Sequence, residues 1–325
     1  MQRREFLSGL GATAATWPLI AGVLPARAQT PDRIFRLGHL ANSAVSEALT
    51  RQVTLPELAK LGFVEGRNLV FDARVGESAT MPGLMGELLA ARPDAVVAVG
   101  PAAMLPAAAA TRTVPIVTFG GDPIEHGLAQ SYARPGGNVT GVVILISELE
   151  PKRLSILREA VPDRRRVAVL TSPATAIGEA ALWKAAGSLG VELLTFPVAA
   201  PADYPAAFVA MRAAGAEALL ISATSEFNRD GKQLAALALE ARLPTVCEWA
   251  DMAHAGCLIG YGPDRTALRK RMAAQIALIF RGAAPGDIAI ERPTAFEFAV
   301  NQKIAKSLEL NIPFSVLAQA DDVIE

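Results

Sequence analysis

The amino-acid sequence predicts an α/β protein made of two doubly wound parallel-sheet lobes that are joined by three crossovers. Short apolar runs alternate with amphipathic stretches along most of the chain, which is typical of βαβ units. Several runs, such as Ala95–Val99, are apolar at every position, as expected for strands buried on both faces of a parallel sheet. The sequence contains eleven predicted strands in all, which is more than one ordinary sheet holds. We therefore expect two sheets of about five or six strands each.

The first 28 residues are predicted to be a secretory signal peptide of the twin-arginine type. They contain the pair Arg3-Arg4, an apolar stretch from Ser8 to Leu24, and small residues around the expected cleavage site after Ala28. The stretch is too short and too interrupted to span a bilayer, which takes about 20 apolar residues. The mature protein is therefore expected in the periplasm.

The mature chain of roughly 297 residues is long enough for two domains with sizeable cores. Arg3, Arg4, Arg27 and Glu5 leave with the signal, so the 31 basic and 32 acidic residues of the whole chain become a net charge of about −3. This balance argues against a nucleic-acid partner, which requires a basic surplus on one face. The hydrophobic content of 51% is that of a globular protein rather than a disordered one.

The apolar runs locate the predicted strands, and the amphipathic stretches locate the helices. Strands are expected at Ile34–Leu40, Leu69–Val75, Ala95–Val99, Pro115–Phe119, Val139–Ile144, Val167–Leu170, Glu192–Phe196, Ala218–Ile221, Thr245–Glu248, Cys257–Gly260 and Ala295–Val300. Helices are expected at Ser46–Leu61, Pro82–Ala91, Pro101–Thr111, Ile124–Ala133, Pro151–Ala160, Ile177–Leu189, Tyr204–Ala214, Phe227–Ala241, Arg265–Arg281 and Gln302–Leu310.

Three segments are expected to carry the chain between the lobes. The first runs from Gly136 to Ser147, the second is Gly260–Pro263, and the third lies near Ala289–Pro293. Lobe 1 is therefore expected to comprise residues 31–143 and 262–290. Lobe 2 is expected to comprise residues 144–261 and 291–325.

Small and polar residues follow the predicted strands of the first half, where open α/β sheets bind their ligands. The candidate ligand-binding residues there are Asn42, Ser43, Ser46, Gly100, Pro101, Ala102, Gly121 and Asp122. The small residues from Gly100 onward leave room for a ligand at a helix N-terminus, where free N–H groups favour an anion such as a carboxylate. Asp122 either receives an ammonium group or caps the next helix, and capping is the commoner role of Asp before Pro.

The second half offers its own polar and aromatic candidates at strand ends. These are Ser172, Thr224, Ser225, Glu248, Trp249 and Tyr261. Trp249 and Tyr261 either stack on a flat ligand or belong to the core. For an amino-acid ligand, we expect the carboxylate at the helix starting near Pro101 and the ammonium at Asp122 or Glu248, because a desolvated charge needs a partner.

No motif for catalysis or for a cofactor is found in the sequence. Dinucleotide-binding, phosphate-loop and nucleophile-elbow patterns are all missing. The three histidines, His39, His126 and His254, lack the spacing of zinc ligands. Catalytic residues, metals and cofactors are therefore not expected. Cys247 and Cys257 either pair in an oxidising compartment or remain two buried thiols, because a separation of ten residues does not fix their geometry.

Six stretches carry a resemblance to a known family. They are Leu61–Asn68, Gly121–Pro123, Ala133–Gly141, Tyr261–Asp264, Pro293–Phe298 and Ala320–Glu325. They are spread over essentially the whole mature chain, and the stretch from Ala133 to Gly141 is long and specific. On these residues the sequence resembles the ABC transporter substrate-binding family often described as tryptophan/tyrosine transport substrate-binding proteins.

The resemblance implies a type I periplasmic-binding-protein fold, with the ligand in a cleft between two lobes. It also implies delivery of the solute to a membrane permease that a separate ATPase drives. We therefore expect a monomer that captures a small amino-acid-like or aromatic solute by hinge closure, without catalysis. Two alternatives remain. One is a periplasmic sensor that acts on a receptor through the same binding chemistry, and the other is a periplasmic α/β enzyme.

Overall fold

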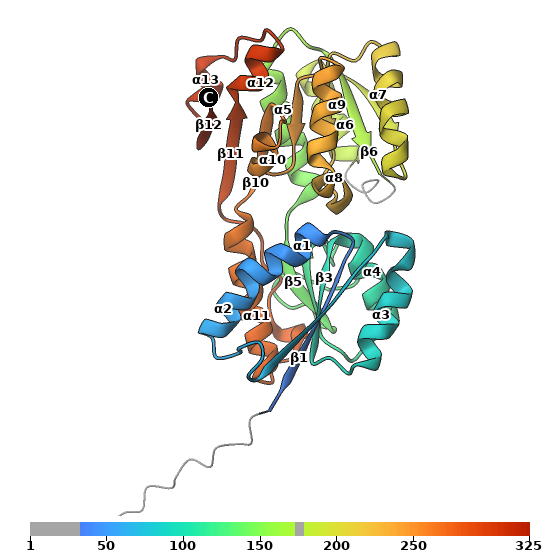
Figure 1. Cartoon of the computed structure of the whole chain (residues 1–325), viewed down its shortest axis with the longest axis vertical. Helices are drawn as coiled ribbons and strands as arrows, with labels where there is room; N and C mark the ends of the chain where they lie inside the picture. Colours follow the sequence, from blue (N-terminus) through green and yellow to red (C-terminus); the bar gives the residue numbers. More distant parts are fainter. Residues whose placement is uncertain (1–32, 173–178) are drawn as a thin grey trace, which may run out of the picture. The chain divides into compact units, whose positions relative to one another are not determined.

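The computed structural model describes residues 33–172 and 179–325. The predicted signal peptide, with its twin-arginine pair and its cleavage site, lies outside the described residues and stays a prediction. Residues 34–325 form one compact unit. This unit contains one five-stranded and one seven-stranded sheet. Figure 1 shows helices packed around the strands of both sheets.

The five-stranded sheet is parallel throughout, with strand order β2-β1-β3-β4-β5. Its strands are β1 (Phe35–Ala41), β2 (Leu69–Val75), β3 (Ala95–Val99), β4 (Ile116–Gly120) and β5 (Val139–Val143). The strand order changes direction between β1 and β3. Such a switch point places the strand ends that follow it at the favoured ligand position of a doubly wound sheet.

Helices cover both faces of this sheet, which explains the continuous apolar runs of its strands. The helices are α1 (Ala44–Leu49), the π-helical turn η1 (Thr50–Thr54), α2 (Leu55–Lys60), α3 (Met81–Ala90), α4 (Gly100–Ala110) and, from far along the chain, α11 (Arg265–Phe280). On β3, Val96 belongs to a buried cluster with Met85 of α3, whereas Val97 belongs to another with Met272 of α11. We refer to this sheet and these helices as the first lobe.

The seven-stranded sheet has strand order β12-β11-β10-β9-β8-β6-β7. Its strands are β6 (Arg166–Thr171), β7 (Glu192–Pro197), β8 (Ala218–Ile221), β9 (Thr245–Cys247), β10 (Ile259–Pro263), β11 (Phe296–Asn301) and β12 (Asp322–Ile324). The pairing of β10 with β11 is antiparallel, and the other pairings in this sheet are parallel, so the predicted parallel sheet has one antiparallel strand. The chain leaves the sheet for α11 after Pro263 and returns at Phe296, which is paired with Pro263, so β11 has to run back along β10.

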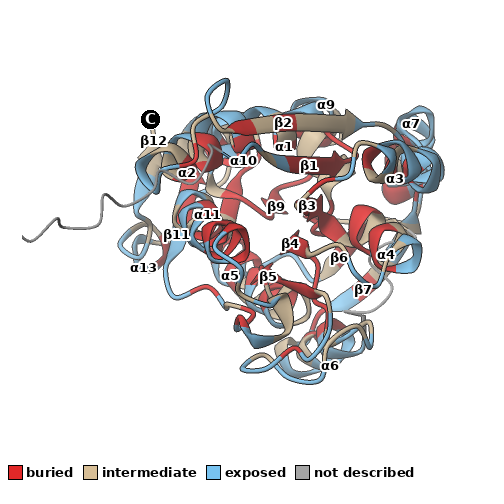
Figure 2. Cartoon of the chain, turned by 90° about the horizontal axis from the view of Figure 1, so that it is seen from below, coloured by how far each residue is buried: buried red, intermediate tan, exposed pale blue. Residues whose placement is uncertain are grey.

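The helices of the second lobe lie along this sheet. They are α5 (Ile146–Ala160), α6 (Glu179–Leu189), α7 (Tyr204–Ala213), α8 (Ser225–Arg229), α9 (Gly231–Glu240), α10 (Ala250–His254), α12 (Gln302–Ser307) and α13 (Phe314–Leu317). Short 3-10 turns complete the fold at Ser78–Thr80, Pro201–Asp203 and Pro285–Asp287. Figure 2 shows buried residues along the strands and the inner sides of the helices. One buried cluster lies within the first lobe and another within the second, while a third contains residues of both sheets.

One predicted helix is wrong. Residues 124–133 form turns, because Gly127 adopts a φ of 68° and the N–H of Leu128 bonds back to the carbonyl of Pro123. The predicted helix 227–241 is split into α8 and α9 at Asp230, and the helix predicted from Ser46 contains the π-turn η1. The short elements β12, α10 and α13 were not predicted. The predicted lobe boundaries themselves remain predictions.

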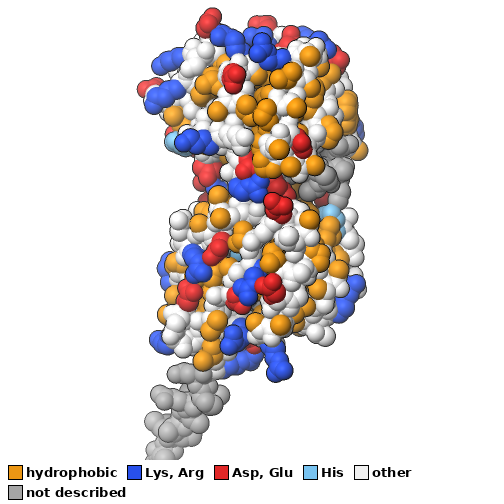
Figure 3. Space-filling model, turned by 45° about the vertical axis from the view of Figure 1, so that its right-hand side comes forward, with side chains coloured by type: hydrophobic (Ala, Val, Ile, Leu, Met, Phe, Trp, Pro, Cys, Tyr) orange, Lys and Arg blue, Asp and Glu red, His pale blue; other side chains and the backbone are white. Residues whose placement is uncertain are grey.

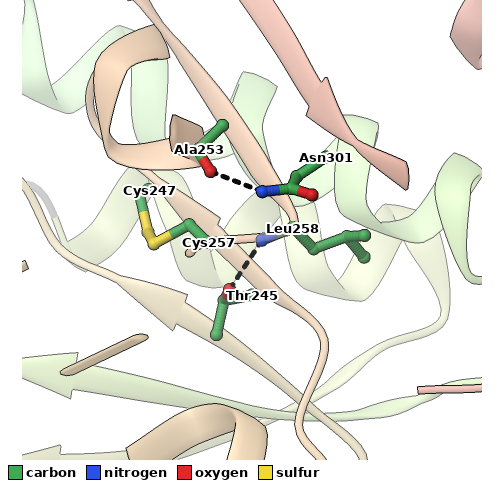
Figure 4. The surroundings of a disulfide bond; sticks show 6 residues. All are labelled: Thr245, Cys247, Ala253, Cys257, Leu258 and Asn301. Carbon is green, nitrogen blue, oxygen red and sulfur yellow. Dashed lines mark hydrogen bonds between the residues drawn. A yellow bond between two sulfur atoms is a disulfide. The ribbon is translucent and has the colours of Figure 1, made fainter. Parts of the chain in front are cut away.

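The two cysteines form a disulfide between the end of β9 and the residue pair that precedes β10 (Figure 4). Both cysteines are fully buried. Beside them, the N–H of Leu258 donates to the Thr245 hydroxyl at 3.1 Å, and the side-chain amide of Asn301 donates to the carbonyl of Ala253 at 2.7 Å. The segment from Cys247 to Cys257 is therefore held at both ends.

The surface shows no large patch of one charge on the face drawn in Figure 3, where acidic and basic side chains lie near one another among hydrophobic ones. This distribution agrees with the nearly neutral composition. Within residues 33–172 and 179–325, no helix combines the length and the apolar character needed to cross a membrane.

Candidate functional site

A pocket lies at the carboxyl ends of strands from both sheets. The first lobe contributes residues at or just after the ends of β1, β3 and β4, including Ser46, Gly100 and Gly120. The second lobe contributes residues that follow β8 and β9, including Thr224 and Glu248. This is the position at which open parallel sheets bind ligands, because the following loops and helix N-termini converge there.

Many of the predicted binding residues line this pocket. They are Ser46, Gly100, Pro101, Thr224, Ser225, Glu248 and Trp249. Asn42 and Ala102 line a smaller hollow beside it, which shares Gly100, Pro101, Thr224 and Ser225 with the main pocket. Asn42 is 4% exposed, and none of its side-chain polar atoms has a partner among the described residues.

The structure gives the other predicted residues different contacts. Ser43 caps α1 by accepting a hydrogen bond from the N–H of Val45. The Asp122 carboxylate accepts from the N–H of Ile124 at 2.8 Å and from the Tyr132 hydroxyl at 2.5 Å, so it acts as a local cap. Gly121 packs against Met104, Tyr261 packs against Phe298, and Ser172 is half-buried next to the undescribed residues 173–178.

The N-terminus of α4 forms part of the pocket wall. Gly100 has a φ of 73°, and a Cβ atom there would come within 3.0 Å of the Ser225 hydroxyl of the second lobe. Glycine therefore provides both the left-handed backbone and the close approach of the two lobes at this point. The N-cap residue of this helix, Val99, makes no side-chain hydrogen bond to it, and Gly100 and Pro101 of its first turn line the pocket, so the positive end of the helix dipole lies at the pocket wall.

Sequence reasoning missed two arginines that line the pocket, Arg265 and Arg269 of α11. Asp264 fixes the start of this helix by accepting a hydrogen bond from the N–H of Ala267 at 2.9 Å. Residues four apart share one face of a helix, so both arginines point the same way. The sequence did contain a signal for these two pocket residues, because a predicted helix with two arginines four residues apart begins directly after a predicted crossover.

The two arginines differ in their partners. The Arg265 guanidinium bonds with the carboxylate of Asp251 and lies 4.9 Å from the centre of the Trp249 ring. Arg269 is 1% exposed, donates from Nη1 to the Thr50 hydroxyl at 2.9 Å, and lies 4.3 Å from the centre of the Phe119 ring. Burial, together with the nearby positive charge of Arg265, lowers the pKa of Arg269 to about 9.

Across the pocket, Glu248 is a buried carboxyl of the second lobe. Burial raises its pKa to about 7, although the charges of Arg153 and Arg265 oppose this rise. Arg153 of α5 is also buried, and it fixes the local backbone by donating to the carbonyls of Tyr261 at 2.8 Å and Glu248 at 3.3 Å. The pocket thus combines two cations, one titratable carboxyl, the rings of Trp249 and Phe119, and a free helix N-terminus.

This arrangement is suited to binding a small solute that carries charge and an apolar part. A model of the family described as "ABC transporter substrate binding protein" matches residues 47–324, nearly the whole described chain. The chain belongs to this family. As a member, it is an extracytoplasmic substrate-binding protein that captures a small-molecule solute for an ABC importer.

Individual relatives are distant but cover most of the chain. A tyrosine-binding protein of Clostridioides difficile is 20% identical over 77% of this chain and 73% of its own length. A conserved domain protein of Vibrio cholerae has a TM-score of 0.83 at 23% identity, covering 90% of this chain and all of that one. An ABC domain from Streptococcus pneumonia in complex with L-Trp has a TM-score of 0.80 at 21% identity, with the same coverage. These likenesses confirm the predicted fold class.

Proposed function

We propose that the protein captures a small amino-acid-like or aromatic solute in the pocket between its two sheets and delivers it to the permease of an ABC importer. The observation that carries this proposal is a pocket with cations on one wall, a carboxyl on the other and aromatic rings on both. The names of two relatives support it, since one is a tyrosine-binding protein and another was crystallised with L-Trp.

Within the pocket, Glu248 is the proposed partner of an ammonium group. A buried carboxyl whose pKa is raised to about 7 gains stability when a ligand cation joins it. The alternative partner that the sequence suggested, Asp122, already receives hydrogen bonds from Ile124 and Tyr132. Trp249 is the proposed stacking surface, because it lines the pocket; the Arg265 guanidinium covers one face of its ring, which leaves the other face for the ligand.

The remaining parts of the proposal concern location and mode of action. We propose export by the twin-arginine signal, cleavage after Ala28, and action as a periplasmic monomer that binds without turnover. The disulfide between Cys247 and Cys257 supports an oxidising compartment. Hinge closure over the solute is the proposed signal that the permease reads.

A thermal-shift screen of the mature protein from Gln29 onward tests the proposal. The panel contains amino acids, aromatic acids, nucleosides and sugars. A solute present at about 100 times its Kd adds about 2.7 kcal/mol to the stability of the folded state, several degrees in the melting curve. Shifts confined to amino acids and aromatic acids are expected, with the solute recovered unchanged. A shift from sugars or nucleosides alone would contradict the proposed solute class.

A further inference from the structure

We infer that the captured solute carries a carboxylate that pairs with the Arg269 guanidinium, and that Thr50 positions this guanidinium. This inference rests on the proposed function and adds to it the ligand group and the residue that receives it. A carboxylate would make this solute chemically different from an uncharged polyol such as allitol, with which a solute-binding protein of Agrobacterium vitis was crystallised.

Arg269 is a buried cation that has no anion beside it in the part of the chain that the structure describes. Among the described residues, its hydrogen-bond partner is the neutral hydroxyl of Thr50, and no carboxylate forms an ion pair with it. The nearby charge that acts on it is that of Arg265, which is repulsive. Its Nε atom is buried and has no partner among the described residues. Arg265, by contrast, is paired with Asp251.

An unpaired buried charge is costly, because it has lost its hydration without gaining a counter-ion. A ligand carboxylate that enters the pocket would offset this cost at Arg269. Thr50 occupies Nη1, which leaves the Nε side of the guanidinium for the two parallel hydrogen bonds that a carboxylate accepts. The Phe119 ring lies against the guanidinium at 4.3 Å and limits the orientations it can adopt.

The π-turn η1 explains how Thr50 comes to hold Arg269. In this turn Thr50 is fully buried, and its hydroxyl donates to the carbonyl of Ser46 at 3.0 Å while it accepts from Arg269. A π-turn inside a longer helix is uncommon and is often found at functional sites. Ser46 itself lines the pocket, so one helix turn connects the pocket wall to the support of the arginine.

Other groups in the pocket agree with an anionic ligand group. The uncapped N-terminus of α4 adds backbone donors, and Arg265 adds a second cation. Glu248 lies on the opposite wall of the pocket. Its ionised form can pair with the ammonium of an amino acid, and its protonated form can lie beside an uncharged part of a ligand. Aromatic amino acids and aromatic monocarboxylates share the carboxylate, so both classes contain the group that we assign to Arg269.

The test compares carboxylate probes with their amides, which have the same shape but no negative charge. Thermal shift and calorimetry are measured with L-tryptophan, L-tryptophanamide, indole-3-propionate and indole-3-propionamide. The amides are expected to bind the wild-type protein about 100-fold more weakly than the acids, because the buried charge then stays unpaired. Equal binding of an acid and its amide would overturn the inference without any variant.

The variant Arg269→Gln is expected to lose the preference for the acids, and Arg269→Lys to retain part of it, since lysine keeps the charge but not the paired donors. The matched control is Arg271→Gln, on the same helix, whose arginine is exposed and pairs with Glu291. Wild-type preference in a folded Arg269→Gln protein contradicts the inference. If only the sugars or nucleosides of the screening panel shift the wild-type melting curve, the protein still captures a solute but the inferred carboxylate is wrong. If no compound of the panel shifts it, the proposed solute capture is contradicted as well.

Discussion

The two walls of the pocket are built in different ways. The first-lobe wall takes its small residues from the ends of β3 and β4, but its cations come from α11, which begins only at Arg265. The second-lobe wall takes its residues from the ends of β8 and β9, and the disulfide closes the segment that carries Glu248 and Trp249. The first wall thus presents an unpaired cation, whereas the second presents a carboxyl on a fixed support.

This difference suggests a division of roles. The second wall is held in place before any ligand arrives, by the disulfide and by the buried hydrogen bonds of Arg153. The first wall contains Arg269, which lacks an anionic partner among the described residues until a solute supplies one. Substitutions in the supports of the second wall, Arg153 and the disulfide, should therefore act mainly on stability, whereas substitution of Arg269 in the first wall should act mainly on binding.

The largest effect on stability is expected from Arg153→Ala. The substitution leaves the carbonyls of Tyr261 and Glu248 without their buried donor, and it opens a cavity between α5 and the sheet. The free energy of unfolding should fall by about 3 kcal/mol. Urea denaturation measures it, with the exposed neighbour Lys152→Ala as control. Equal stabilities of the two variants would show that Arg153 does not support the wall.

Removal of the disulfide should have a slightly smaller effect. For a closed loop of this length, the double variant Cys247→Ala/Cys257→Ala is expected to lose about 2 to 3 kcal/mol of stability. Hydrogen exchange should rise in the segment around Trp249 and stay unchanged in the five-stranded sheet. An increase spread evenly over both lobes would contradict the local support that distinguishes the second wall.

The pH dependence of stability should have opposite signs in the two lobes. Burial raises the pKa of Glu248 to about 7 and lowers that of His39, in the first lobe, to about 3. The folded state therefore favours the protonated form of Glu248, and the stability that this residue contributes is lost as pH rises from the ordinary glutamate value through 7. The folded state disfavours the protonated form of His39, and the stability that this residue contributes is lost as pH falls below the ordinary histidine value.

Two variants separate these contributions between pH 4.5 and 6.5. Glu248→Gln should remove a loss of stability with rising pH, so the free energy of unfolding should rise about 2 kcal/mol more over this window than in the wild type. His39→Gln should remove a gain of stability with rising pH, so the free energy of unfolding should rise about 2 kcal/mol less. Besides burial, Glu248 is affected by the charges of Arg153, Arg265 and Glu150 and by a hydrogen bond with the Trp249 side chain. His39 is affected by the charges of Arg269 and Arg51. Denaturation midpoints measured at several pH values would refute this pattern if both variants changed the slope in the same direction.

The smallest effect is expected from Thr50→Val, which keeps the shape of the side chain but removes the acceptor of Arg269. Binding of indole-3-propionate should weaken by about fivefold, the equivalent of one hydrogen bond of about 1 kcal/mol. Thr54→Val, in the same π-turn, is the control, because its hydroxyl has no partner among the described residues. Equal losses in both variants would indicate a general disturbance of η1.

Much of the fold was predictable because strand burial leaves a direct mark on the sequence. Runs such as Ala95–Val99 and Ala218–Ile221 predicted strands with the observed bounds. The antiparallel β11 was not predictable from its own residues, since its direction follows from where the chain returns after α11. The helix expected at 124–133 failed because its apolar pattern outweighed Gly127, whose positive φ turns the chain.

The residues of the site also differ in how well the sequence predicted them. Glu248, Trp249 and Gly100 were predictable because each follows its strand directly. Arg265 and Arg269 were missed because they reach the pocket from a crossover helix, and only the three-dimensional return of the chain brings α11 beside β4. Asp122 was a reasonable candidate by position, but its local hydrogen bonds with Ile124 and Tyr132 occupy the carboxylate.

The most direct test of the central claim, that one solute joins the cationic and the acidic wall, is calorimetry of L-tryptophan and indole-3-propionate with three proteins. These are the wild type, Arg269→Gln and Glu248→Gln. Arg269→Gln should weaken both ligands by about 100-fold, because both carry the carboxylate. Glu248→Gln should weaken L-tryptophan alone, because only that ligand carries an ammonium. Wild-type affinities for both ligands in both folded variants would contradict the account.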